Sequence, residues 1–326
     1  MSEHGGGREY EIVVAEGVLT DVEVEREHLS GRAAIRLASL RTAEDVARET
    51  QSANAVVVTV EQLPRQFIEL FGPGMRIIAR AGIGLDAIDL VAAREHGLAV
   101  FHTPDYATEE VATHTVALIL ALNRKLFQGD ALARSAWRSW ANLKPVPAVS
   151  GLTVGIVGLG RIGRAVADRL GPFGADIVGF DPYVTEPPAG IRLAANLDEL
   201  LSQSDVLTLH LPASEETSGL IGARELALLP PGAVVVNVSR GALLDQLALV
   251  GALDSGHIAG AGLDVLAVEP LPEHDPIATA PNVILSPHFA WYSEASNRRM
   301  RTMAVDGILD YLEGRPVSVG RLAVVP

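Results

Sequence analysis

The amino-acid sequence predicts an α/β protein with two doubly wound parallel-sheet domains. Its 326 residues are about twice the length of one typical domain. Short β-branched runs alternate with helical patterns along the chain, which is typical of strand–helix–strand units around parallel sheets. These runs fall into two series, so we expect two sheets.

The first series of apolar runs lies before His102 and has mixed polar segments between its members. We expect strands at Ile12–Ala15, Ala55–Thr59, Ile77–Ala79 and Leu98–Phe101.

The second series is cleaner and supplies six expected strands, enough for a complete doubly wound sheet. They are Thr153–Val157, Asp176–Phe180, Val206–Leu211, Val234–Val238, Gly260–Asp264 and Val283–Ser286.

Two long helices are expected where the two series join. Thr108 is placed to cap a helix that runs to Leu122 and is apolar on both sides. A second apolar stripe runs from Met300 to Leu312 and ends before Gly314. We expect this last helix to return the chain to the first domain.

Composition excludes several classes of function. The net charge of -14, without a basic run, disfavours binding to nucleic acid or to an anionic membrane. The absence of cysteine excludes disulfides and thiolate metal sites, and no His or acidic cluster has metal-ligand spacing, so no metal site is expected. The first ten residues lack signal-peptide features, and we expect a cytoplasmic protein.

A glycine-rich motif follows the expected strand Thr153–Val157 directly and precedes a helical stretch. In such a motif the first glycine permits a tight turn, the second admits a pyrophosphate and the third allows helix–strand packing. The motif predicts dinucleotide binding by Gly158, Leu159, Gly160, Arg161, Ile162 and Gly163.

An acidic residue, Asp181, follows the next expected strand, 18 residues beyond Gly163. A carboxylate there accepts hydrogen bonds from the adenosine ribose hydroxyls and repels a 2′-phosphate, so NAD is favoured over NADP. A simple turn residue before Pro182 is the alternative.

Three further strands of the second series each end in a polar side chain suited to catalysis. They are Arg240 after Val234–Val238, Glu269 in the segment after Gly260–Asp264, and His288 after Val283–Ser286. Ligands bind at this edge of open parallel sheets, so the three side chains are expected to converge.

The order and spacing of these three residues resemble those of the D-isomer-specific 2-hydroxyacid dehydrogenases. Most of the chain shares the resemblance, and the segment from Ala290 to Glu294 resembles the C-terminal binding protein branch most. It implies a discontinuous fold, in which a Rossmann NAD-binding domain (103–292) is inserted in a flavodoxin-like substrate-binding domain (1–102 and 293–326). It also suggests a homodimer through the nucleotide domain.

The resemblance implies roles for further residues. The substrate loop would run from Arg80 to Asp89, with Ala87 where the family usually has Asn. Asp264 would contact the nicotinamide carboxamide, although a strand-end cap explains it too, and Thr113 would lie near the same ring. Trp291 would bound the substrate pocket, with ordinary core packing as the alternative. The implied substrate residues are Arg80, Gly82, Ile83, Gly84 and Trp291.

These expectations define an NAD-dependent 2-oxo acid reductase or D-2-hydroxyacid dehydrogenase. His288 would act as general acid, Glu269 would orient its ring and Arg240 would hold the substrate carboxylate and carbonyl. One alternative is an NAD(H)-responsive binding protein like the corepressors of that branch. The other is phosphoglycerate or phosphite oxidation on the same scaffold. Phosphoglycerate dehydrogenases often carry an extra regulatory domain, and we expect that none fits after residue 315.

Overall fold

The computed structural model describes residues 10–137 and 140–326, and these divide into two compact units. The first unit contains the chain up to Ala107 together with Ser293–Pro326, and the second is the continuous segment Thr108–Tyr292. The chain passes to the second unit after Ala107 and returns to the first at Ser293.

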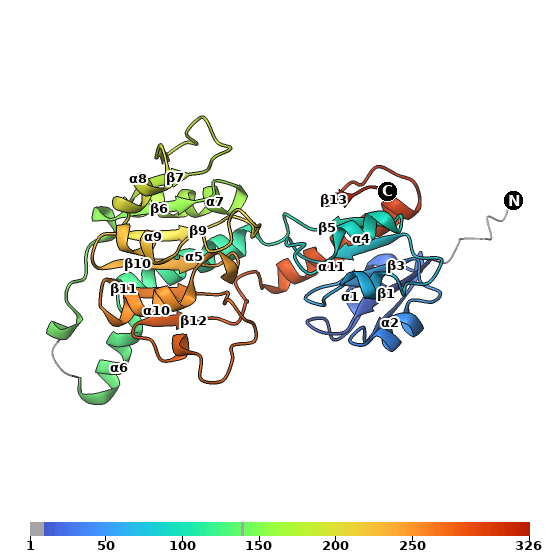
Figure 1. The fold of residues 1–326 in the computed structure, drawn as a ribbon, viewed down its shortest axis with the longest axis horizontal. Coiled ribbons are helices and arrows are strands. Elements are labelled where there is room, and N and C mark those ends of the chain that lie inside the picture. Colours follow the sequence, from blue (N-terminus) through green and yellow to red (C-terminus); the bar gives the residue numbers. More distant parts are fainter. Residues whose placement is uncertain (1–9, 138–139) are drawn as a thin grey trace, which may run out of the picture. The chain divides into compact units, whose positions relative to one another are not determined.

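In its described part, the first unit contains a six-stranded sheet in the order β13-β5-β4-β3-β1-β2 (Figure 1). The strands are β1 (Tyr10–Ala15), β2 (Ala33–Ala38), β3 (Ala55–Val58), β4 (Ile77–Arg80), β5 (Ala99–His102) and β13 (Arg321–Val324). The helices are α1 (Glu23–Leu29), α2 (Ala43–Glu49), α3 (Arg65–Ile68), α4 (Leu90–Glu95) and α11 (Glu294–Leu312).

Two strands of this sheet have no counterpart in the sequence-based expectations. β2 pairs in parallel with β1 at the edge of the sheet, and its Arg36 bonds to Glu11 and Glu49 on neighbouring elements. β13 pairs antiparallel with β5, so the sheet is parallel except at this edge. Parallel doubly wound sheets commonly carry one antiparallel edge strand.

Helix α11 begins at Glu294, six residues before the first apolar residue of its predicted stripe. Ser293 caps it, because the Ser293 hydroxyl accepts the N–H of Ser296 and the Ser296 hydroxyl lies 2.8 Å from the N–H of Ser293. This polar first turn is stabilised by its capping box rather than by an apolar face.

The second unit contains, in its described part, a seven-stranded parallel sheet in the order β12-β11-β10-β9-β6-β7-β8. The chain order reverses between β6 and β9, which is the topological switch point of a Rossmann sheet. Its strands are β6 (Thr153–Val157), β7 (Asp176–Phe180), β8 (Arg192–Leu193), β9 (Val206–Leu209), β10 (Ala233–Asn237), β11 (Ile258–Leu263) and β12 (Val283–Leu285).

The helices of the second unit cover both faces of this sheet. They are α5 (Thr108–Asn123), α6 (Leu126–Ala136), α7 (Arg161–Leu170), α8 (Leu197–Ser202), α9 (Ala223–Leu228) and α10 (Gln246–Asp254). Short 3-10 helices lie at Trp140–Leu143, Val149–Gly151, Gly171–Phe173, Gly241–Leu243 and Pro276–Ala278. Leu118 and Leu122 of α5 pack closely against Gly262 of β11, where a β-carbon would lie 3.1 Å from Leu118 and 3.2 Å from Leu122.

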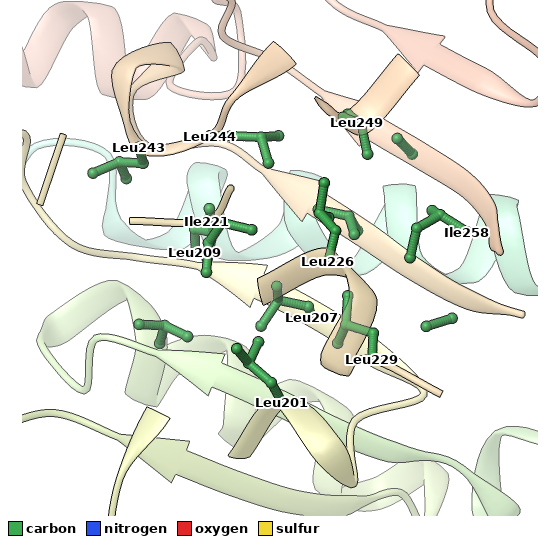
Figure 2. Close-up of a cluster of buried hydrophobic side chains, with 14 of the residues drawn as sticks. Leu201, Leu207, Leu209, Ile221, Leu226, Leu229, Leu243, Leu244, Leu249 and Ile258 are labelled. Atoms are coloured by element: carbon green, nitrogen blue, oxygen red, sulfur yellow. The ribbon is translucent and has the colours of Figure 1, made fainter. Parts of the chain in front are cut away.

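The core on one face of this sheet is a cluster of apolar side chains, which includes leucines from β9, α8, α9 and α10 and Ile258 from β11 (Figure 2). Leu207 and Leu209 of β9 point into it and are fully buried. Burying each such side chain stabilises the fold by about 1.5–3 kcal/mol. The cluster therefore fixes the strands whose carboxyl ends carry the candidate site.

Candidate active site

The glycine loop connects β6 to α7 at the switch point of the second sheet. Gly158 has φ = 94°, and a β-carbon there would lie 2.6 Å from the carbonyl oxygen of His210. A β-carbon on Gly163 would lie 2.1 Å from the carbonyl oxygen of Gly158, so this glycine lets α7 approach the turn. By contrast, a β-carbon on Gly160 would meet nothing within 4 Å, so this position is open for a ligand.

Asp181 follows β7 and braces the same loop. Its Oδ2 accepts the N–H of Leu159 at 2.9 Å, and its Oδ1 accepts the N–H of Tyr183 at 2.9 Å. Each carboxylate oxygen keeps a second lone pair, so the two oxygens together can accept hydrogen bonds from two ribose hydroxyls.

The residues at this switch point fit a dinucleotide. Arg161 and Ile162 form the first turn of α7, whose N-terminus presents backbone N–H groups and the positive end of the helix dipole. The open space at Gly160 has room for a pyrophosphate beside this helix N-terminus. Asp181 follows the neighbouring strand β7, where its carboxylate is placed to accept hydrogen bonds from a ribose.

His288 and Glu269 form a hydrogen-bonded pair at the carboxyl ends of β12 and β11. The Nδ1 atom of His288 lies 2.7 Å from Oε2 of Glu269, and Oε1 of Glu269 accepts the N–H of Leu266 at 2.9 Å. Burial alone would raise the pKa of Glu269, but the hydrogen bonds from His288 and Leu266 outweigh it and lower the pKa. Glu269 is therefore a carboxylate that orients the imidazole and leaves Nε2 available.

Arg240 follows β10, and its positive charge also lowers the pKa of Glu269. Its Nη1 donates to the carbonyl of Ser239 at 2.7 Å, and its own carbonyl accepts from Asn237 at 2.8 Å. Three strand ends thus bring a guanidinium, a carboxylate and an imidazole to one edge of the sheet.

A pocket of about 500 Å³ lies beside His288. Asp264, Ser286 and the Glu269–His288 pair contribute polar groups to it, and the rest of the lining is apolar. The apolar residues are Leu266, Pro270, Leu271, Leu285 and Pro287.

Asp264 is only 2% exposed and lies at the end of β11. Its carboxylate accepts the Ser286 hydroxyl at 2.6 Å and the N–H groups of Phe289 and Ala290 at 2.9 Å each. These bonds commit both of its oxygens to the segment that carries His288.

Two other expected site residues lie at different places in this unit. Thr113 is exposed on α5, with its hydroxyl 3.4 Å from Nε of Arg169 on α7. Trp291 is half-buried, its Nε1 donates to the carbonyl of His288 at 3.0 Å, and its ring meets that of Tyr292 edge-on. Trp291 is therefore not a fully buried core residue.

The expected substrate loop lies in the first unit. The N–H of Gly82 donates to the buried Thr103 hydroxyl at 2.8 Å, so this amide is already engaged within the protein. The carbonyl of Ile83 lies 2.9 Å from Nδ1 of His102, and the N–H of Leu63 donates to the carbonyl of Ala87 at 2.7 Å. The loop is thus braced by neighbouring strand ends and backbone, with alanine at position 87.

Arg80 and Gly84 complete that loop. Arg80 ends β4, and its Nη1 atom would lie 2.5 Å from a β-carbon on Gly82, where φ is 149°. The glycine therefore makes room for the guanidinium. Because the Gly82 amide already donates to Thr103, a substrate carboxylate at this loop would have to be bound by the amides of Ile83 and Gly84.

Sequence reasoning missed three residues that shape the site. Ser286 and His114 connect to Asp264, and Gly241 lets the segment after β10 touch the one after β11. Ser286 stands two residues before His288 and Gly241 directly after Arg240, so position relative to the expected set was the available signal. His114 has no such signal, because it lies 172 residues from its partner Ser286.

The part of the chain that the structure describes gives two further findings. It contains no group of three or more metal-ligating side chains close enough to hold a metal ion. Nor does any helix in it combine the length and the apolar character that crossing a membrane requires.

A Rossmann sheet with a glycine loop, a carboxylate after the next strand and a strand-end Arg, Glu and His is typical of dinucleotide-dependent dehydrogenases. Residues 116–290 match the family model described as D-isomer specific 2-hydroxyacid dehydrogenase, NAD binding domain. The chain belongs to this family, and its second unit is an NAD-binding domain. The finer resemblance to the C-terminal binding protein branch stays a prediction.

Similar proteins carry several names. The chain is 41% identical over 233 residues to "D-3-phosphoglycerate dehydrogenase" of Mycobacterium leprae. The aligned region is 69% of this chain but only 43% of that relative. The chain is 32% identical to "Hydroxypyruvate reductase" of Blautia hydrogenotrophica, over 86% of this chain and 89% of that relative. The structure of Aquifex aeolicus D-lactate dehydrogenase with NAD and lactic acid is similar at a TM-score of 0.87, with 27% identity and 97% and 99% of the two chains covered.

Proposed function

We propose that the protein is an NAD-dependent D-2-hydroxyacid dehydrogenase that reduces small 2-oxo acids. The observation that carries this proposal is the 2.7 Å hydrogen bond between Glu269 Oε2 and His288 Nδ1. It holds one ring nitrogen of His288 and leaves the other to exchange a proton with substrate, as a general acid must.

The chain's own groups then act on the substrate in a defined order. When bound, NADH supplies the hydride that converts the carbonyl carbon to a carbinol carbon. Arg240 holds the substrate carboxylate and carbonyl oxygen with its planar fork and stabilises the charge that develops on that oxygen. His288 Nε2–H donates the proton to the same oxygen, which completes the hydroxyl, and Glu269 stabilises the imidazolium before transfer.

The NAD-binding residues proposed for this reaction are those of the glycine loop and Asp181. Gly158, Gly160 and Gly163 shape the turn, and Arg161 and Ile162 begin the helix that faces the pyrophosphate. The free lone pairs of Asp181 favour the unphosphorylated ribose, which supports NAD over NADP. Thr113 keeps its proposed place beside the nicotinamide.

The pocket beside His288 favours an uncharged substrate side chain. Its walls are mainly leucine and proline, it is bordered by the carboxylates of Asp264 and Glu269, and its described lining includes no lysine or arginine. A phosphate monoester there would face two carboxylates, with no lysine or arginine in the described lining to offset them. Glyoxylate, hydroxypyruvate and other unphosphorylated 2-oxo acids are therefore the proposed substrates, with Trp291 limiting their size.

The substrate-binding role of the first unit is proposed on the loop that contains Arg80, Ile83 and Gly84. The backbone amides of Ile83 and Gly84 and the guanidinium at the end of β4 provide the chemistry that a substrate carboxylate requires.

Phosphoglycerate oxidation is the second candidate, because a relative named for it is 41% identical over 69% of this chain. This chain aligns with less than half of that relative's length, so the relative's activity is a candidate here and no more.

We further propose a cytoplasmic homodimer through the NAD-binding unit. Apolar side chains of this unit stand in solvent on α6 and the 3-10 helix after it: Leu126 is 58% exposed, Phe127 62% and Trp140 66%. On α5, Ala117 is exposed and Leu120 half-buried, although the sequence predicts an apolar face there. Exposed apolar patches of this kind favour a protein partner, and a second copy supplies a matching one.

The test of activity is a substrate panel with purified full-length protein. NADH oxidation is followed with glyoxylate, hydroxypyruvate, phenylpyruvate and phosphohydroxypyruvate, and NAD reduction with 3-phosphoglycerate and phosphite. We expect turnover with unphosphorylated 2-oxo acids, its loss in His288→Gln, and its retention in His274→Asn, which changes a 90% exposed histidine. Turnover of phosphorylated substrates alone would favour the second candidate, and NADH binding without turnover would favour an NAD(H)-responsive binding protein.

A further inference from the structure

The backbone at His288 is held in an unusual conformation. Its φ is 53°, in the left-handed region that non-glycine residues rarely adopt. Such a conformation is strained and persists only where surrounding contacts impose it. The contacts around His288 therefore decide where its imidazole points.

Those contacts converge on Asp264. The N–H of His288 donates to the main-chain carbonyl of Asp264 at 2.8 Å. The next two N–H groups, of Phe289 and Ala290, donate to Oδ1 and Oδ2 of the same residue at 2.9 Å each. One buried residue thus receives three successive amides of the segment that carries the proposed acid.

A third side chain extends this arrangement to helix α5. The Ser286 hydroxyl donates to Oδ1 of Asp264 at 2.6 Å, so its oxygen is left to accept a hydrogen bond. Nε2 of His114 lies 2.9 Å from that oxygen and must carry its hydrogen there. The rings of His114 and Phe289 also form a T-shaped contact, at 6.1 Å between centroids and 83° between planes.

We propose that His114, Ser286 and Asp264 are positioning residues that hold residues 288–290 in this conformation and thereby aim the His288 imidazole. The proposal rests on the function proposed for His288. It also assigns Asp264 a different role from the expected contact with the nicotinamide carboxamide, because its carboxylate is buried and already accepts three hydrogen bonds from the protein.

The test combines deletion with conservative rescue at two positions. His114→Leu removes one hydrogen bond and Ser286→Ala removes two, whereas Ser286→Thr and His114→Gln retain a hydroxyl and an N–H donor. Thr115→Val is the matched control, because it removes a buried hydroxyl of α5 that bonds only to the carbonyl of Val111 among the hydrogen bonds described. Asp264→Asn replaces one acceptor oxygen by a donor, so it cannot receive both amides.

Activity and cofactor binding separate the two roles of Asp264. We expect kcat to fall about tenfold in the two deletion variants, to recover in the rescue variants and to stay unchanged in Thr115→Val. The Kd of NADH, from equilibrium fluorescence titration, should change less than about twofold in every variant, Asp264→Asn included. A Kd weakened tenfold with kcat retained would overturn the proposal in favour of a nicotinamide contact.

A second readout does not depend on activity. Amide hydrogen exchange at Phe289 and Ala290 should be about tenfold faster in Ser286→Ala and His114→Leu than in wild type, and slow again in the rescue variants. The ring signals of His288, assigned with His288→Gln, should move in the same variants. Unchanged exchange and unchanged ring signals would overturn the proposal. If wild type turns over no 2-oxo acid, the proposed function fails, and these two measurements still decide the positioning role.

Discussion

A β-carbon on Gly241 would lie 1.9 Å from the carbonyl oxygen of Leu266. Arg240 precedes that glycine, and Glu269 bonds to the N–H of the same leucine. The close backbone approach of these two segments therefore sets the spacing between the guanidinium and the carboxylate of the site.

Gly241→Ala should consequently separate the two segments. The atoms in its way are backbone, which cannot rotate aside, so we expect a loss of about 1–3 kcal/mol in the free energy of unfolding, together with reduced kcat/KM. Urea denaturation and steady-state kinetics measure the two effects. Gly251→Ala on α10 is the control: its β-carbon meets nothing within 4 Å, and it should stabilise by about 0.5–1 kcal/mol. Equal behaviour of the two variants would contradict this account of Gly241.

Asp181→Asn should narrow the preference for NADH over NADPH. It removes the charge that repels a 2′-phosphate and one of the two acceptor oxygens, an effect of about 1–3 kcal/mol, or roughly 10- to 100-fold in the ratio of kcat/KM values. The control Asp176→Asn changes a carboxylate at the other end of the same strand, which pairs with Arg192. An unchanged cofactor ratio in Asp181→Asn would remove Asp181 from the cofactor site.

Glu269→Gln should lower kcat for reduction by about 10²- to 10⁴-fold, because the amide cannot stabilise the imidazolium. The pKa of Glu269 lies below its ordinary value of 4.5 in the folded protein. Its carboxylate therefore contributes stability above the unfolded pKa, and this contribution is lost as pH falls through the lower folded pKa. The stability difference between wild type and Glu269→Gln should shrink in that acid range. A difference that stays constant as the pH falls would refute the pairing.

Trp291→Ala should change substrate choice. We expect lower kcat/KM with the best small 2-oxo acid and higher relative use of phenylpyruvate, because an apolar pocket discriminates by about 1–3 kcal/mol per methylene. Trp291→Phe keeps most of the volume but loses the hydrogen bond to the His288 carbonyl, so it separates size from bonding. Equal loss on every substrate in Trp291→Ala would indicate packing alone.

His210 should make the fold sensitive to acid. Burial lowers its pKa from 6.5 to about 3, so the unfolded chain binds a proton that the folded protein does not. Stability is therefore complete above the unfolded pKa and is lost as pH falls toward the folded pKa, by about 2 kcal/mol between about pH 7 and pH 5. His210→Gln should remove this part of the pH dependence in urea titrations, and His274→Asn should retain it. Parallel pH profiles for wild type and His210→Gln would show that His210 is protonated in the folded protein.

The elements that depend on local pattern were predictable from the sequence. β6 and β7 coincide with the expected runs to the residue, and α7 was expected because the glycine motif marks its start. β2 was missed because Arg36 interrupts its apolar alternation, and only the acidic partners Glu11 and Glu49, on other elements, compensate that charge.

The candidate site likewise has a part that the sequence predicts and a part that it does not. Arg240, Glu269 and His288 follow three strands, so sheet topology alone brings them to one edge. The bonds from Ser286 to Asp264 and from His114 to Ser286 depend on side-chain directions across 22 and 172 residues of chain, and no spacing encodes those.

The fold of the first unit also bears on how the chain assembles. A β-carbon on Gly307 of α11, or on Gly320 before β13, would lie within 2.3 Å of the Phe101 ring. The absence of a side chain at both positions therefore leaves space for that ring. β5 gains its antiparallel neighbour only from Arg321–Val324. During synthesis, this edge of β5 and the Phe101 ring therefore lack these partners until more than 200 further residues have been made. The second unit is the continuous segment Thr108–Tyr292, so all of its residues are made before Ser293. It can therefore complete its fold before the first unit does.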